Sequence, residues 1–438
     1  MSSSSATLDK IVSLCKRRGF VYQSGEIYSG LNGVYDFGPL GAVLKNIIKN
    51  KWLEYMTSFP EEVVQLDGSL LGSAEVWKAS GHLDNFSDPM VDCLSCKKRY
   101  RSDDPDFNIE KNCPSCGNKQ WTEIRKFNLM FQTQLGAMAD ATSVAYLRPE
   151  TAQAIFINFK NVMSSYRVKV PFGIAQIGKA FRNEITPKQF LFRVREFEQM
   201  EMEFFCKGED ADKFFDLWVQ RRLEFFSLMG LDKARLRARY QTPEELAHYS
   251  KACADIEYEF PFGWKELEGV ANRQDYDLSQ HSKHSGKELA VFDEAAKTSY
   301  IPHVVESSVG VDRLFLTLLF DAYHEDVVEG EMRVVLRFAP SVAPFTAAIM
   351  PLSGKISEQA EKIYLDLKKQ GFRVQFDESG SIGKRYRRQD EIGTPVCFTY
   401  DFDSVNDNQV TARNRDTTKQ ERVAIDSLPQ YLRDLMRG

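Results

Sequence analysis

Two strand-forming runs separated by a polar stretch constrain the fold of this chain more than any other feature of the sequence. The runs cover 168–177 and 197–205, and the stretch between them is centred on Ile-Thr-Pro-Lys-Gln at 185–189. Runs of this kind around a segment of turn-forming residues are typical of neighbouring antiparallel strands. The sequence therefore predicts an antiparallel hairpin with a long loop over 166–205.

Charged and aromatic residues flank the loop of this expected hairpin. Arg182 and Glu184 are two positions apart, so on a strand they would share one face, and Phe197 and Glu201 of the next run can point to the same space. Arginine binds phosphate and carboxylate oxygens through a rigid charged fork, and a phenylalanine ring can stack on a purine. The pattern indicates a nucleotide site, and a charged, solvated hairpin is the alternative.

Two other segments have helical patterns. Apolar residues recur at helical spacing over 40–55, and Pro60 precedes an extended segment at 62–66, which predicts a long helix followed by a strand. The segment 310–323 starts with Gly310 and continues as a mostly apolar, deeply buried helix. Arg313 in its first turn needs an anionic partner, which is either a substrate or a structural Asp or Glu.

Four of the eight cysteines form two CxxC pairs, Cys93 with Cys96 and Cys113 with Cys116, separated by sixteen residues. This spacing is typical of a structural zinc site with four thiolate ligands. The alternative is four reduced thiols in a loop. A catalytic zinc is not expected, because four thiolates leave no open position for water.

Length, charge and cysteine use set the broad class. A chain of 438 residues exceeds what one core usually supports, so two or three domains are expected. A net charge of −5 restricts any RNA contact to a local surface. The scattered remaining cysteines, the short apolar stretches and a polar N-terminus predict a cytoplasmic protein with no membrane span and a disordered tail at 1–6.

After about residue 330 short strands and helices alternate, which predicts a separate small α/β domain. We expect strands at 334–338, 372–376 and 396–400, helices at 356–370 and 384–391, and a domain boundary within 326–333. Basic residues at 384–388 and 413–415, with Tyr386 for stacking, would suit an unpaired RNA base. A solvated helix face is the alternative there.

Together these segments resemble the three ordered motifs of class II aminoacyl-tRNA synthetases, at 40–66, 181–197 and 310–313. The resemblance is closest to glycyl-tRNA synthetases of the homodimeric type and covers almost the whole chain. It rests on the segments 34–41 (Val-Tyr-Asp-Phe-Gly-Pro-Leu-Gly), 80–82, 86–90, 127–131, 147–153 (Leu-Arg-Pro-Glu-Thr-Ala-Gln), 263–267 and 343–345.

The resemblance implies an α+β fold with three parts. A class II catalytic domain over 7–330 would be built on an antiparallel sheet with flanking helices and would contain a zinc-ribbon-like insertion at 91–120. An α/β anticodon-binding domain would occupy 331–438. The implied activity is activation of glycine by ATP with Mg²⁺, followed by transfer of glycine to the 3′ end of tRNA(Gly), carried out by a homodimer.

The resemblance also assigns residues to this reaction. The catalytic residues would be Arg182, Glu184 and Arg313. Arg182 would bridge the glycine carboxylate and the α-phosphate, and Arg313 would stack on the adenine opposite Phe197. ATP would contact Arg182, Asn183, Glu184, Phe192, Arg193, Val194, Arg195, Glu196, Phe197, Glu266, Leu267, Gly310, Val311, Asp312 and Arg313.

An acidic pocket formed by Glu150, Glu201 and Glu306 would hold the glycine ammonium. The full set implied for glycine is Arg101, Glu150, Phe197, Glu198, Gln199, Met200, Glu201, Glu306, Ser307, Ser308, Val309 and Gly310. Ser307 departs from the family, which has a proline at this position. The alternatives are a class II enzyme specific for threonine, proline or serine, an inactive synthetase-like RNA-binding protein, and a zinc-ribbon nucleic-acid adaptor.

Overall fold

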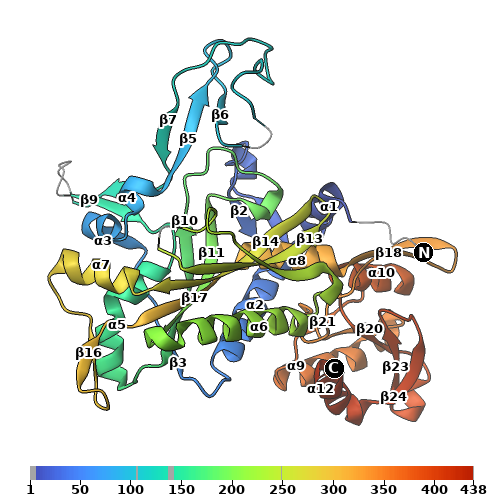
Figure 1. The fold of residues 1–438 in the computed structure, drawn as a ribbon. Helices are drawn as coiled ribbons and strands as arrows, with labels where there is room; N and C mark the ends of the chain where they lie inside the picture. Colours follow the sequence, from blue (N-terminus) through green and yellow to red (C-terminus); the bar gives the residue numbers. More distant parts are fainter. Residues whose placement is uncertain (1–5, 105–106, 137–142, 248, 438) are drawn as a thin grey trace.

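The computed structural model describes residues 6–104, 107–136, 143–247 and 249–437. A central sheet with its helices forms the body of the molecule, a narrow insertion projects from one end, and the C-terminal residues form a separate unit beside the body (Figure 1). The tail expected at 1–6 lies outside the described residues except for Ala6, which is buried.

The central sheet has seven strands in the order β12-β13-β14-β17-β11-β10-β3. Neighbouring strands are antiparallel, except that β3 runs parallel to β10. This mixture of helices with an antiparallel sheet confirms the expected α+β class. The strands are β3 (Val63–Gln65), β10 (Phe172–Phe181), β11 (Glu196–Cys206), β12 (Leu236–Tyr240), β13 (Ala252–Phe260), β14 (Gly263–Gln274) and β17 (His303–Gly310).

The β10–β11 pair is the hairpin expected from the sequence, with Phe172 opposite Phe205 and Phe181 opposite Glu196. Its first strand begins four residues later than 168 and continues to Phe181. Arg182 and Glu184 consequently lie after the strand, in the connecting loop, and do not occupy alternate strand positions. The conformation of the loop, and not strand periodicity, therefore determines where the side chains of Arg182 and Glu184 point.

Strand alternation divides the sheet into two different faces. On one face Met200, Met202 and Phe204 of β11 belong to the main apolar core, together with side chains of α2 (Pro39–Met56), α6 (Ala211–Leu228) and α8 (Val311–Ala322). On the other face Phe205 packs in a second apolar cluster with side chains of α5 (Ala152–Tyr166) and α7 (Tyr276–Ser285).

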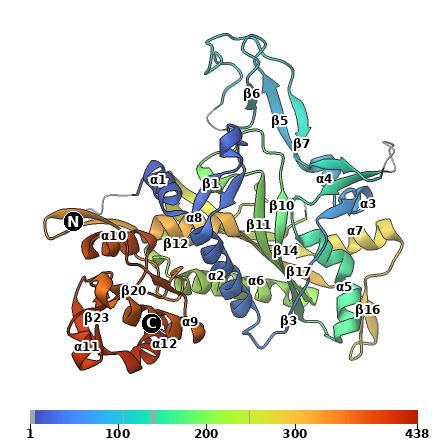
Figure 2. The same ribbon diagram turned by 180° about the vertical axis from the view of Figure 1, so that it is seen from behind.

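The helices expected at 40–55 and 310–323 are confirmed as α2 and α8. Strand β3 follows α2, as expected, and α2 runs along the side of the sheet that faces the viewer in Figure 2. Gly310 is the residue that caps α8, and Leu314, Phe315 and Leu318 of this helix are buried. None of the helices in the described residues is both long and apolar enough to cross a bilayer.

Smaller elements lie around the central sheet. The projecting insertion is a three-stranded sheet with β5 between β6 and β7, and β5 and β7 extend it beyond the expected 91–120. Its strands are β5 (Ser87–Asp92), β6 (Arg99–Arg101) and β7 (Arg125–Asn128). The other small elements of the body are α1 (Leu8–Arg18), β1 (Val21–Gln23), β2 (Tyr35–Phe37), β4 (Leu71–Ser73), α3 (Ala74–Ala79), α4 (His82–Asn85), β8 (Gln132–Gln134), β9 (Val144–Leu147), β15 (Val291–Asp293) and β16 (Thr298–Tyr300).

The C-terminal unit is an α/β fold with its own apolar core. Its five-stranded sheet has the order β21-β20-β22-β23-β24, and its first strand, β20, was not expected from the sequence. The strands are β20 (Ala347–Pro351), β21 (Val374–Phe376), β22 (Val396–Tyr400), β23 (Gln409–Asn414) and β24 (Gln420–Ala424). Its main helices are α9 (Ser357–Lys369), α10 (Ile382–Ile392) and α12 (Leu428–Arg437).

The region of the expected boundary at 326–333 is a β-hairpin and not a linker. Strand β18 (Tyr323–Val328) pairs with β19 (Glu331–Leu336), so the strand expected at 334–338 belongs to this hairpin and not to the C-terminal sheet. Leu336 and Phe338 pack in the main core. Arg333 is buried between Asp326 of the hairpin and Asp390 of α10, which joins the two units through an ion pair.

Three of the six basic residues expected to face RNA in the C-terminal unit are buried, whereas Lys384, Arg387 and Arg388 are at least partly exposed. Arg385, Arg413 and Arg415 are buried. Arg413 donates to Asp390, and Arg415 pairs with Asp416. The expectation of an exposed basic surface at 413–415 was therefore wrong, because these arginines hold the unit together.

A buried ion pair connects α6 to the rear of the sheet. Nε of Arg222 donates to both carboxylate oxygens of Glu268, at 2.8 and 3.0 Å, and both side chains have no exposed area. The hydroxyl of Ser307 donates to the same carboxylate at 2.5 Å. These contacts link helix α6 with β14 and β17, the two strands that carry much of the site described below.

We expect Arg222→Met to lower the free energy of unfolding by about 3–5 kcal/mol, because it leaves the carboxylate of Glu268 buried and without its cation. Denaturant unfolding followed by tryptophan fluorescence measures this change. Lys251→Met is the control, since Lys251 forms an exposed pair with Asp212 and its loss should cost less than about 1 kcal/mol. Equal effects of the two substitutions would contradict this account of the sheet.

Candidate active site

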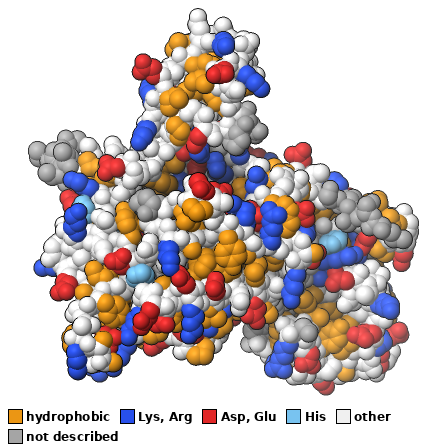
Figure 3. All heavy atoms as spheres, viewed as in Figure 1, with side chains coloured by type: hydrophobic (Ala, Val, Ile, Leu, Met, Phe, Trp, Pro, Cys, Tyr) orange, Lys and Arg blue, Asp and Glu red, His pale blue; other side chains and the backbone are white. Residues whose placement is uncertain are grey.

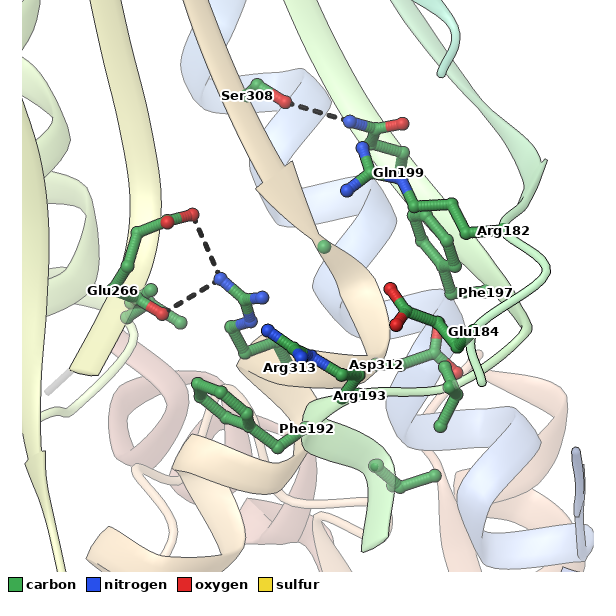
Figure 4. Close-up of a pocket in the computed structure, with 14 residues that line it drawn as sticks. Arg182, Glu184, Phe192, Arg193, Phe197, Gln199, Glu266, Ser308, Asp312 and Arg313 are labelled. Atoms are coloured by element: carbon green, nitrogen blue, oxygen red, sulfur yellow. Dashed lines mark hydrogen bonds and ion pairs between the residues drawn. The ribbon is translucent and has the colours of Figure 1, made fainter. Parts of the chain in front are cut away.

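A cavity opens where the β10–β11 hairpin meets the start of α8, and basic side chains gather in the recess below the projecting insertion (Figure 3). Its walls come from the loop after β10, from β11 and β14, and from the turn between β17 and α8. It is lined by Arg182, Glu184, Leu191, Phe192, Arg193, Val194, Phe197, Gln199, Glu266, Leu267, Ser308, Gly310, Asp312 and Arg313 (Figure 4).

Arg182 lies at one end of this cavity. Its Nε donates to the carbonyl of Pro149 at 3.1 Å, and its guanidinium lies 5.3 Å from the ring centre of Phe197 and 5.5 Å from that of Phe86. Within the described residues it forms no ion pair. A cation held by a backbone carbonyl and two rings, with no carboxylate partner, is ready to take an anionic ligand.

Arg313 lies at the opposite end of the cavity. Its Nη1 donates to the backbone carbonyl and to the carboxylate of Glu266, each at 2.9 Å, and its guanidinium lies 4.5 Å from the ring centre of Phe192 (Figure 4). The ring that contacts Arg313 is therefore Phe192, while Phe197 lies beside Arg182. The flat guanidinium is already stacked, and its other face can receive a second flat group.

Several residues expected to contact ATP do not line the cavity. Arg195 donates to the backbone carbonyls of Glu184 and Asn32, Glu196 pairs with Lys179, and Val311 is buried in the main core. Asn183 bonds through its backbone N–H to Leu129, and its side chain is also absent from the lining. Arg195 and Asn183 thus hold the hairpin loop in place, and the cavity is lined by neighbouring residues.

A group of carboxylates lies next to the Arg182 end, on the face of the sheet that carries α5 and α7. Glu201 is almost fully buried. Its carboxylate accepts hydrogen bonds from Thr151 (the backbone N–H at 2.8 Å and the hydroxyl), from Gln199 at 2.6 Å and from Ser308 at 2.7 Å. Burial, reinforced by the charges of Glu150 and Glu306, raises the pKa of Glu201 to about 7.

Glu150 and Glu306 complete this group. Glu150 lies 3.3 Å from the His82 ring nitrogen and accepts from Gln153 at 3.0 Å. Burial acts to raise the pKa of Glu150, but the charge of His82 and that of Arg273 lower it well below its ordinary value. Burial raises the pKa of Glu306, although its 2.5 Å contact with Arg273 opposes that shift.

Strand alternation excludes four side chains of the expected glycine set from this site. Met200 and Val309 lie in the main core on the rear face of the sheet. Glu198 pairs there with Lys45 and Lys49, and the hydroxyl of Ser307 bonds to Glu268. These four side chains therefore point away from the acidic group, and only the backbone atoms of these residues can border the site.

Arg101 also lies elsewhere. It belongs to β6 of the insertion, where it pairs with Asp88 at 3.2 Å and with Asp103 at 2.8 Å. The structure does not bring its guanidinium to the cavity lined by Arg182.

Sequence reasoning missed four residues that support the acidic group: His82, Thr151, Arg273 and Asp277. Arg273 is buried and pairs with both Asp277 and Glu306. His82 and Thr151 lie in the segments 80–82 and 147–153, which carry the family resemblance but assign no role to these two residues. Arg273 lies in β14 and Asp277 in α7, so helical spacing gives no signal for their ion pair.

The four cysteines of the insertion come together as their spacing predicts. The sulfur atoms of Cys93 and Cys116 are 3.6 Å apart, those of Cys96 and Cys113 are 3.7 Å apart, and all four lie within 4.8 Å of one another. A zinc ion with bonds of about 2.3 Å to four tetrahedral sulfurs separates them by about 3.8 Å. The donor set and its dimensions therefore fit a four-thiolate zinc site.

Comparison with known proteins decides the family. Residues 137–323 match the family model of the tRNA synthetase class II core domain (G, H, P, S and T), and residues 346–435 match that of the anticodon binding domain. The glycine–tRNA ligase of Caldanaerobacter subterraneus subsp. tengcongensis is 53% identical, over 98% of this chain and 99% of that protein. The chain belongs to the glycine–tRNA ligase family.

Other members of the glycine–tRNA ligase family are similarly close. The protein of Clostridium acetobutylicum is 50% identical over 98% of this chain and 99% of its own length, and that of Treponema denticola is 51% identical over 97% and 96%. The matched class II core contains β10, β11, β14, β17 and the start of α8, which are the elements that surround the cavity. The resemblance inferred from the sequence motifs is thus confirmed.

Proposed function

We propose that this member of the glycine–tRNA ligase family activates glycine with ATP and transfers it to the 3′ end of tRNA(Gly). The observation that carries the proposal is the placement of Arg182 between two different sites. On one side of it lies a cavity with a second arginine, and on the other side lies a buried acidic group. An amino acid joined to the α-phosphate of ATP has a matching order of charges, with its ammonium group at one end and the negative phosphate next to the nucleoside.

Activation forms a bond between a glycine carboxylate oxygen and the α-phosphorus, and breaks the bond from that phosphorus to pyrophosphate. No protein nucleophile takes part, so the residues act by orientation and by neutralising charge. Arg182 would hold the glycine carboxylate and the α-phosphate together. Arg313 would stack on the adenine, with Phe197 on the opposite side, and Arg193 would meet the outer phosphates.

The second step transfers the glycyl group. A terminal ribose hydroxyl of the tRNA attacks the adenylate carbonyl carbon, and AMP leaves. Mg²⁺, when bound with ATP, would supply positive charge to the phosphates, and Glu184 and Glu266 are carboxylates lining the cavity that offer oxygen ligands for it. Burial raises the pKa of Glu184, while Arg193 and Arg182 oppose that shift.

Glycine has no side chain to grip, so selectivity depends on its ammonium and on the exclusion of larger amino acids. Glu150, Glu201 and Glu306 surround the proposed ammonium position. Ser308 is hydrogen-bonded to both Gln199 and Glu201, which fixes its hydroxyl at the wall where a larger substrate would place its side chain.

The other specificities of the class are less consistent with this arrangement. A threonine or serine enzyme needs a partner for the substrate hydroxyl, and here the nearby polar groups already bond to one another. An inactive RNA-binding relative would not need Arg182 and Arg313 in the cavity. Relatives of about 50% identity over the full length carry the name glycine–tRNA ligase, which favours glycine.

Zinc, oligomeric state and tRNA binding belong to the same proposal. Cys93, Cys96, Cys113 and Cys116 would hold a structural zinc ion that stabilises the insertion, since little apolar surface is buried there. The C-terminal unit, in which residues 346–435 match the anticodon binding domain, would bind the anticodon. We further propose that the enzyme works in the cytoplasm as a homodimer, because its sequence motifs resemble the homodimeric type of glycyl-tRNA synthetase.

The first prediction concerns Arg182. Wild-type protein should exchange pyrophosphate into ATP in the presence of glycine, and Arg182→Ala should lower kcat/KM by about 10²–10³, because it removes the charge placed at the reacting phosphate. Arg237→Ala, a substitution of an exposed arginine paired with Glu257 on β12 and β13, is the control and should keep full activity. Equal exchange with alanine or serine, or none with glycine, would refute the proposed specificity.

The second prediction concerns pH. Acidification protonates Glu201, whose pKa is about 7, and removes a negative charge from the ammonium site. At pH 6 about one tenth of the sites keep this charge, so the KM for glycine should be about tenfold higher at pH 6 than at pH 8. The KM for ATP, measured in the same exchange assay, serves as control and should change less than about twofold. A glycine KM that is constant or falls on acidification would contradict this role.

The third prediction concerns the metal. Purified protein should contain about one zinc ion per chain, and Cys96→Ser or Cys113→Ser should reduce that content. Cys253→Ser is the matched control, because Cys253 lies in β13, outside the insertion, and should leave zinc unchanged. Metal analysis by mass spectrometry decides the outcome, and folded protein with no zinc would end the four-thiolate proposal.

A further inference from the structure

Glu203 is a buried carboxyl group that the proposed mechanism does not use. It has no exposed area, and neither of its carboxylate oxygens has a hydrogen-bond partner within the described part of the chain. Buried polar groups are almost always hydrogen-bonded, so an unpartnered carboxyl inside a functional region requires an explanation.

Glu203 lies at the floor of the amino-acid site. Phe197, Gln199, Glu201, Glu203 and Phe205 are alternate residues of β11 and share one face. The first two line the cavity, Glu201 belongs to the acidic group, and Phe205 packs in the apolar cluster beneath α5. Glu203 is therefore the last polar residue before the apolar interior.

The residue directly opposite Glu203 on the neighbouring strand β17 is Glu306. Directly opposed side chains on antiparallel strands have Cβ atoms about 4.5–5.5 Å apart, so the two carboxyl groups are close neighbours. Two carboxylates at such a distance cannot both be charged in a buried site unless a cation separates them.

The surrounding charges do not provide a cation for Glu203. Among the described residues, the charges that act most strongly on Glu203 are those of Glu306 on β17, Arg273 at the end of β14, Glu201 on the same strand and Asp277 on α7. Arg273 is already engaged by Asp277, at 2.7 and 2.9 Å, and by Glu306. Burial and the charge of Glu306 raise the pKa of Glu203 well above its ordinary value, with Arg273 opposing.

We propose that Glu203 is a positioning residue of the amino-acid site: as an uncharged carboxylic acid it donates a hydrogen bond to Glu306 and fixes that carboxylate toward the substrate ammonium. This role rests on the proposed function. A protonated carboxyl has one O–H to donate, and Glu306 opposite is the carboxylate that can accept it. Such contacts are often long in a free enzyme and shorten when the substrate binds.

The proposal also explains the charge of the site. With Glu203 neutral, Arg273 stays with Glu306 and Asp277, and Glu150, Glu201 and Glu306 are left to receive the single positive charge of the substrate. A charged Glu203 would compete with Glu306 for Arg273 and would add negative charge where nothing balances it. The hydrogen bond from neutral Glu203 thus fixes the carboxylate of Glu306 and leaves the net charge around the glycine ammonium unchanged.

Two substitutions show whether Glu203 acts as a hydrogen-bond donor, as a negative charge or only by filling space. Glu203→Gln keeps an N–H donor, so its KM for glycine should stay within about threefold of wild type. Glu203→Met removes the donor at similar volume and should raise the KM for glycine about tenfold, with kcat and the KM for ATP nearly unchanged. A glutamine variant as impaired as the methionine variant would overturn the proposal, as would a methionine variant with normal kinetics or a uniform loss of all three parameters.

A spectroscopic test needs neither substrate nor the methionine variant. At pH 9, where Glu201 with its pKa of about 7 is ionised, the infrared spectrum of wild type should contain a C=O stretching band of a protonated carboxylic acid that Glu203→Gln removes. Glu257→Gln is the control and should leave the band, because the Glu257 carboxylate is paired with Arg237 and Arg239. Absence of a band that depends on Glu203 overturns the proposal, whereas wild-type protein that shows the band but does not use glycine would refute only the proposed function.

Discussion

The antiparallel pairing of β11 with β17 is the constraint on which the rest of the structure depends. Side chains alternate between the two faces of these strands, so a single strand sends Met200, Met202 and Phe204 into the main core and Glu201 and Glu203 to the other side. A shift of register by one residue would place the carboxylates in the apolar core. The acidic site and the hydrophobic core are therefore specified by the same hydrogen-bonded ladder.

Buried charge on both faces of the sheet is balanced in different ways. On the rear face the carboxylate of Glu268 accepts hydrogen bonds from Arg222 and Ser307. These bonds hold α6, β14 and β17 together. On the site face Arg273 satisfies Asp277 and Glu306, and Glu201 depends on neutral donors instead. The rear face is a structural connection, while the site face retains an excess of negative charge that an ammonium ion would relieve.

The parts of the fold that sequence predicted are those set by local patterns. The hairpin at 166–205, the helices α2 and α8 and the cysteine cluster follow from periodicity and spacing, and the structure contains all four. Glu150, Glu201 and Glu306, which the resemblance named together, lie near one another in the structure. Each of these predictions depends on residues that are near one another in the chain or on a continuous sequence motif.

The errors came from geometry that such patterns do not contain. The motifs at 197–201 and 306–310 are continuous in sequence, so the expected glycine site included Met200 and Ser307. The side chains of these two residues lie on the opposite face of the sheet. Arg273 and Asp277 join the site only because β14 and α7 fold against β17, and nothing in their local sequence points to Glu306. The basic segment at 413–415 misled for a related reason, since a charge in sequence does not distinguish a solvated arginine from one buried against Asp390.

In the proposed mechanism, Arg182 separates a nucleotide cavity from an ammonium site made of buried carboxylates. The decisive measurement is a crystal structure of the protein with a non-hydrolysable analogue of glycyl-adenylate. We expect the ammonium group within hydrogen-bond distance of Glu150, Glu201 or Glu306, the phosphate on Arg182 and the adenine on Arg313. An analogue bound with its ammonium away from these carboxylates, or with its phosphate away from Arg182, would contradict it.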